Sequence, residues 1–173
     1  MKRPVLPFSA MAAALVAGCA TLGLESLVQA PRFTTVSNQQ AELRVLGPST
    51  SRPLGGAQVR LWARVENPNA FGVTLAALRG NLHLENAHAA EVDFPLGVPL
   101  LAGRDTIIPL DVSISFADLP GLADAVQRML TRNLVAYRLD GTLTLDAGAL
   151  GRPTFGPTTW LEGQTRVVRA GVR

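Results

Sequence analysis

The chain has 173 residues, of which 47% are hydrophobic and 17% are charged. This length suits about one domain, and the apolar content excludes a disordered polyampholyte. The single cysteine excludes an intrachain disulfide framework and a cysteine-rich metal site, and two histidines leave little basis for a zinc enzyme.

The net charge of +3 comes from 16 basic and 13 acidic residues. Lys2 and Arg3 lie in a segment that we expect to be removed, which leaves 14 arginines and a net charge of +1. These arginines are scattered along the chain, with acids such as Glu66 and Asp111 between them. A nucleic-acid-binding surface is instead a clustered basic face, so no nucleic-acid partner is predicted.

The first 18 residues predict an export signal. After a basic start, an apolar run from Val5 to Gly18 is too short for the roughly 20 residues that span a bilayer. It ends in Val16-Ala17-Gly18-Cys19, which resembles the lipobox of bacterial lipoproteins, although Val16 stands where leucine is commonest. The resemblance implies that Cys19 is acylated, with palmitate among its chains, and becomes the new N-terminus. An ordinary or uncleaved signal peptide with an incidental cysteine is the alternative.

The expected location follows from this segment. Two acyl chains suffice for stable anchoring in a membrane, so Cys19 would hold the protein at the cell envelope. No aspartate follows Cys19 directly. By similarity to Gram-negative lipoproteins, this favours the outer membrane, with the protein facing the periplasm. We therefore expect a signal peptide over 1–18, a tether over 19–30 and one domain over 31–173.

The first part of this domain is predicted to be mostly β. Residues 33–46 suggest one strand with an irregular lead-in, and residues 47–56 form a loop rich in Gly, Pro and Ser. Gln58 to Glu66 alternates between apolar and polar side chains, which is typical of a half-buried strand. Asn67-Pro68-Asn69 ends it, since proline lacks a backbone donor and asparagine favours turns.

The same alternation continues along the chain, with one helical interruption. Strands are expected over 73–84, 105–116, 134–146 and 158–169, and a helix over 119–132 whose apolar residues recur at helical spacing. The segment 92–101 is apolar but contains two prolines, which places it at a sheet edge or at bulges. About seven short strands with Gly/Pro turns and one helix predict a single β-sandwich.

Three stretches of the sequence resemble a known family. They are VRLWARVENPNAFGVTL (59–75), PLDVSISFADLPGLADAV (109–126) and VAYRLDGTLTLDAGALGRPTFG (135–156). They are similar to the type 2 late embryogenesis abundant (LEA) family, whose module is also called the water-stress and hypersensitive-response domain. The strand that ends in Asn-Pro-Asn before Phe-Gly is the most specific part, and the similarity covers about 30–163. It implies an immunoglobulin-like or fibronectin-III-like sandwich with one short helix, a role in desiccation or water stress, and no catalytic residues or cofactor.

The residues themselves offer little chemistry. His83 and His88 would lie on opposite faces of a continuous strand, because an odd separation reverses side-chain direction. We therefore predict no metal site. Asp111, Ser113 and Ser115 share one strand face, but no histidine is near and no nucleophile-elbow motif occurs. The sequence predicts that the protein is not an enzyme.

Three residues are candidates for contact with a partner or ligand. Trp62 lies on the polar side of its strand between Arg60 and Arg64, where it could stack on a ligand or sit at a membrane surface. Burial under the arginine stems or under the helix is the alternative. Asn67 and Asn69 could belong to a loop that contacts a partner or a lipid head group, or could simply bond to local backbone.

Two functions remain open at this point. The first is a non-enzymatic envelope lipoprotein whose LEA type 2-like domain protects or binds envelope components during water stress. The second is an envelope assembly or carrier module that binds a hydrophobic ligand or adds a client strand along an exposed edge. The apolar segment 92–101 would be that edge or the wall of a cavity.

Overall fold

Strands dominate the residues that the structure, a computed structural model, describes: 27–50, 53–118 and 134–169. In chain order they are β1 (Arg32–Thr35), β2 (Glu42–Leu46), β3 (Gly56–Glu66), β4 (Val73–Leu84), β5 (Ala87–Leu100), β6 (Asp105–Ser115), β7 (Leu134–Asp146) and β8 (Thr154–Arg169). Short 3-10 helices follow β6 and β7, namely η2 (Phe116–Asp118) and η3 (Gly148–Leu150). The predicted all-β class is confirmed. The predicted signal peptide, Cys19 and the predicted helix over 119–132 lie outside the described residues.

Most predicted strands are found at their expected positions, with β4 and β7 matching their predicted bounds. The strand expected over 33–46 is instead two strands, β1 and β2, separated by residues 36–41. Both pair with β3, β1 with residues 63–66 and β2 with residues 56–60. Residues 32–46 therefore pair with two successive parts of the same edge of β3, and the chain leaves that edge between them.

The strands form one mixed sheet with the order β1-β3-β2-β8-β7-β4-β5, and β6 pairs with β3. All pairs are antiparallel except β2 with β8, which run parallel from Glu42↔Arg166 to Val45↔Arg169. This parallel pair joins the part of the sheet around β3 to the part around β7. β5 is the last strand in the order, as its prolines predicted.

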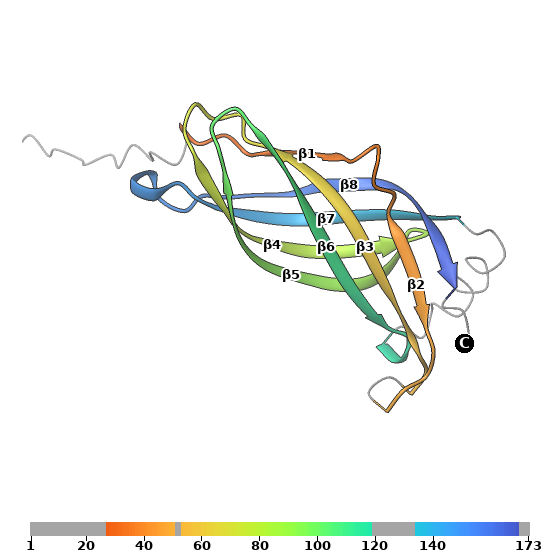
Figure 1. Cartoon of the computed structure of the whole chain (residues 1–173). Coiled ribbons are helices and arrows are strands. Elements are labelled where there is room, and N and C mark those ends of the chain that lie inside the picture. The colour runs from red at the N-terminus through yellow and green to blue at the C-terminus, as the bar shows by residue number, and fades with distance from the viewer. Residues whose placement is uncertain (1–26, 51–52, 119–133, 170–173) are drawn as a thin grey trace, which may run out of the picture.

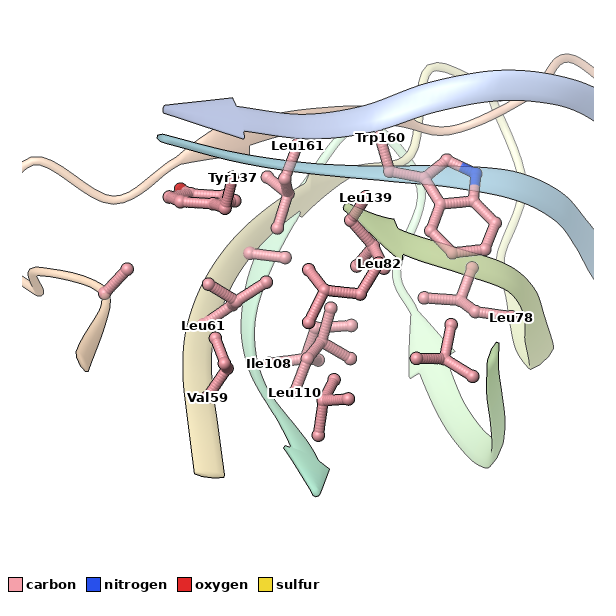
Figure 2. Close-up of a cluster of buried hydrophobic side chains, with 14 of the residues drawn as sticks. Val59, Leu61, Leu78, Leu82, Ile108, Leu110, Tyr137, Leu139, Trp160 and Leu161 are labelled. Atoms are coloured by element: carbon pink, nitrogen blue, oxygen red, sulfur yellow. The ribbon is translucent and has the colours of Figure 1, made fainter. Parts of the chain in front are cut away.

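The sheet bends over its own inner face and encloses the core. In Figure 1, β2, β3 and β6 run obliquely across β4, β5, β7 and β8. Figure 2 shows side chains of β3 and β6, such as Leu61 and Leu110, meeting those of β4 and β7, such as Leu82 and Leu139. All four side chains have no exposed surface. The alternating apolar residues of β3 and β6 are thus core, whereas Phe116, which was expected to face inward at the end of the second strand, lies in η2 and is only partly buried. Trp160 also lies in the core, with 3% exposure.

Two glycines allow the backbones of β4 and β7 to approach closely at the middle of the sheet. Gly80 and Gly141 are directly paired. A Cβ atom on Gly80 would lie 1.9 Å from the carbonyl oxygen of Asp140, and one on Gly141 would lie 2.2 Å from that of Arg79. Gly141 also has a φ of +154°, a backbone conformation that side-chain-bearing residues rarely adopt. These positions therefore require glycine.

Candidate functional site

The β3–β4 loop, residues 67–72, is held by a buried asparagine at its start. Asn67 has no exposed surface. Its side-chain amide donates to the carbonyls of Phe71 at 2.8 Å and Leu100 at 3.1 Å. Its backbone N–H donates to the carbonyl of Arg104 at 2.9 Å. One side chain thereby joins its own loop to the turn between β5 and β6.

Asn69 extends this network to the chain that enters from the N-terminal side. Its side-chain amide donates to the side-chain oxygen of Asn67 at 2.8 Å and to the carbonyl of Gln29 at 3.0 Å. Its own side-chain oxygen accepts the backbone N–H of Gln29 at 2.8 Å. The amide group thus pairs with Gln29 as a neighbouring strand would. We call these contacts the asparagine clamp, formed by Asn67, Asn69 and Gln29.

The clamp explains why asparagines stand at these positions. Both side chains are at least 97% buried and bonded within the protein. Only the bond from Asn67 to Phe71 is the local backbone bond that the alternative expected, because Leu100 and Gln29 lie 33 and 40 positions away. A contact between this loop and a partner stays a prediction. The exposed residues that could make it are Ala70 and Gly72.

Trp62 lies on the outer face of β3, half-buried, opposite Pro109 of β6. The arginines that flank it are paired with acids of β6. Arg60 donates to Asp111 at 2.7 and 3.1 Å, and this hydrogen bond together with the charge of Asp111 raises the pKa of Arg60. The Arg64 guanidinium donates likewise to Asp105. Trp62 therefore lies between two ion pairs, with part of its ring surface open for contact.

The two histidines lie on the same side of the sheet, which corrects the expectation from their spacing. A turn at Glu85–Asn86 separates them, so His83 and His88 are cross-strand partners with ring centroids 5.8 Å apart. The Nε2 atom of His83 lies 3.2 Å from Oδ1 of Asp140. In the described part of the chain, no group of three His, Cys, Asp or Glu side chains could hold a metal ion.

Sequence reasoning missed a hollow beside Tyr137, the only tyrosine in the chain. A depression of about 450 Å³ is lined by Tyr137 together with residues of β4 and β8, including His83 and Glu162. Gly163 is the cross-strand partner of Tyr137 and leaves room for its ring. Burial raises the pKa of Tyr137. Only the pairing of β7 with β8 brings these residues together, so no local sequence signal could have located the hollow.

The family model for late embryogenesis abundant protein (LEA_2) matches residues 63–158, more than half of the chain. The chain belongs to this family. The resemblance drawn from the three sequence stretches is thereby confirmed. The matched LEA residues include the Asn-Pro-Asn segment and the hollow's Tyr137, whereas Trp62 and Cys19 lie outside the match. A comparison with curated protein sequences gives no match.

The fold of this chain is also found in a solved structure. The chain is similar to the solution structure of AT1g01470 from Arabidopsis thaliana, with a TM-score of 0.60 and 14% identity over 84% of this chain and 86% of that one. The solution structure of a late embryogenesis abundant protein, At2g46140.1, matches with a TM-score of 0.44 and 19% identity, over 73% of this chain and 70% of that one. The crystal structure of a protein from Archaeoglobus fulgidus matches with a TM-score of 0.44 and 12% identity, over 74% of this chain and 95% of that one. Only the first similarity is close enough to support a conclusion, which is that the two share a fold.

The structure does not describe Cys19, so its acylation stays a prediction. Among the residues that are described, no helix is long and apolar enough to cross a membrane.

Proposed function

We propose that this LEA protein is a non-enzymatic lipoprotein of the bacterial envelope that protects or binds envelope components during water stress. The observation that carries the proposal is the family match over residues 63–158. The lipobox-like segment ending at Cys19 supports the anchor, and its lack of a following aspartate supports the outer membrane, facing the periplasm. We further propose that the bent sheet is a variant of the immunoglobulin or fibronectin-III sandwich.

The clamp is consistent with a tethered domain. Gln29 lies ten residues after Cys19, and Asn69 holds its backbone through two hydrogen bonds. A force applied to the tether would therefore act first on the β3–β4 loop, through Asn69, and not on β1. Val28, next to Gln29, is 3% exposed and packs in the core, which secures the same point.

Intact mass and survival after drying test the two halves of the proposal. The membrane-fraction protein should have the mass of a chain that begins at Cys19 with two or three acyl chains, and Cys19→Ser should remove them. A deletion strain should survive desiccation less well than wild type, and a gene copy with Cys19→Ser should restore survival less well than the unchanged gene. Equal survival of the deletion strain would refute the protective role, and an unmodified mass would refute the anchor.

A second candidate is the assembly or carrier module, which the position of β5 at the sheet edge favours. Pro95 and Pro99 remove backbone donors from one part of β5, but residues 87–94 are free of proline. An added client strand would pair there, and a hydrophobic ligand would be retained on purification. Native mass spectra that show neither lipid nor client in the purified protein would count against this role.

A further inference from the structure

Four connecting segments lie together at one end of the sheet. They are residues 27–31, 67–72, 101–104 and 147–153, and we call them the entry end. The clamp joins Gln29 to the second segment, and Gly103 N–H donates to the carbonyl of Asn69 at 3.2 Å. Thr74 pairs with Asp146, which places the fourth segment beside the start of β4. In Figure 1 this end, with the β7–β8 turn, lies on the left.

The entry end combines apolar surface with positive charge. Its charged residues are Arg104 and Arg152. The acids that border its segments, Glu66, Asp105 and Asp146, each face an arginine in an ion pair. Leu27 and Leu101 are 62% and 64% exposed. Arg104 makes no ion pair with another described residue, whereas Arg152 lies 3.7 Å from Asp146. Exposed leucines beside an unpaired arginine match the boundary between lipid headgroups and acyl chains.

The opposite end of the sheet has a different character. Leu54 and Leu134 are exposed there as well. Glu85 lies in the β4–β5 turn and Asp118 follows β6, so the chain places carboxylates at this end. The connecting segments of the two ends therefore differ in charge, since those of the entry end contain arginine and no carboxylate.

The entry end is also where an anchored chain would meet the membrane. Leu27 lies only eight positions after Cys19, and an extended chain spans at most about 3.6 Å per residue, or roughly 29 Å over this stretch. The clamp fixes the point at which this tether reaches the domain. Such a short link keeps the local concentration of the entry end at the lipid surface high, so weak individual contacts suffice.

We propose that the entry end docks on anionic phospholipid headgroups, with Leu27 and Leu101 entering the interface and Arg104 pairing with phosphate. This inference rests on the proposed anchor at Cys19 and adds an orientation to it: the entry end faces the bilayer and the β4–β5 turn points away. The planar guanidinium suits a phosphate because it can donate two parallel hydrogen bonds.

A fluorescent label compares the two ends of the same molecule. Because an acylated Cys19 has no free thiol, Leu101→Cys in the full lipidated protein provides a single site for an environment-sensitive fluorophore. Leu54→Cys, at a position 67% exposed on the opposite end, is the matched control. Each protein is reconstituted in vesicles of phosphatidylcholine, alone or in an equal mixture with phosphatidylglycerol, with and without a lipid-borne quencher.

We expect a blue-shifted emission and several-fold stronger quenching for the label at position 101 than for that at 54. We expect the difference to grow with phosphatidylglycerol and to lose that dependence in an Arg104→Ser background. Equal, water-like emission from both positions in protein whose mass shows acyl chains would overturn the docking and leave the anchor standing. A mass without acyl chains would refute the anchor itself, and the docking with it.

Discussion

Replacing Asn67 with aspartate is the sharpest test of the clamp, because the change keeps the shape of the side chain while it replaces the donor group with a carboxylate oxygen. In Asn67→Asp, a carboxylate oxygen would face the carbonyl oxygens of Phe71 and Leu100, which the amide now contacts at 2.8 and 3.1 Å. These two hydrogen bonds and the longer one to the carbonyl of Leu101, at 3.3 Å, are lost, and each carbonyl left without a partner costs about 1–3 kcal/mol. With a buried charge added, we expect a loss of about 3–5 kcal/mol from the free energy of unfolding.

This loss should depend on pH in a defined direction. Burial beside carbonyl oxygens raises the pKa of the introduced carboxyl above the value of about 3.9 that it has in the unfolded chain. The variant is therefore least impaired in acid, where the protonated carboxyl can donate a hydrogen bond. The deficit grows as pH rises from about 3.9 through the raised pKa of the folded state.

Urea unfolding followed by tryptophan fluorescence measures both effects, since Trp160 lies in the core. Asn38→Asp, which adds the same charge at an exposed turn position, is the matched control and should unfold within about 0.5 kcal/mol of the unchanged protein. A deficit for Asn67→Asp as small as that of the control, or one independent of pH, would refute the role given to the clamp.

Three further outcomes follow from burial and backbone geometry. Gly80→Ala should lower the free energy of unfolding by about 4 kcal/mol or prevent folding, because its Cβ would meet a β7 carbonyl. The control Gly47→Ala, with open space around it, should unfold at nearly the same urea concentration as the unchanged protein. Leu61→Ala, fully buried, should cost about 2–5 kcal/mol; an unfolding midpoint like that of Leu101→Ala, at an exposed position, would contradict the core. Tyr137 should titrate above its ordinary pKa of 10.0, so that stability falls as pH rises through about 10; ultraviolet absorbance reports this one tyrosine, and titration at 10.0 in the folded protein would argue against its burial.

The sequence by itself determined the class of fold and the family of this protein. The alternation of apolar residues in 58–66 and 105–116 placed their side chains correctly on the core face, because strand side chains alternate regardless of tertiary context. Asn67-Pro68-Asn69 and the stretches around it were sufficient to identify the family, since these residues are adjacent along the chain. The prolines of the segment 92–101 likewise placed it at a sheet edge, because a proline nitrogen cannot donate to a neighbouring strand.

Only the tertiary structure decided which distant residues meet. His83 and His88 are neighbours because a turn lies between them, formed by Glu85 and Asn86, both at positive φ. The expectation from their spacing assumed a continuous strand and so could not predict this turn. The clamp joins Asn69 to a residue 40 positions away, and the hollow beside Tyr137 depends on the register of β7 with β8. Such contacts are set by strand pairing and by the bend of the sheet, which arise from the packing of the whole core rather than from any local pattern.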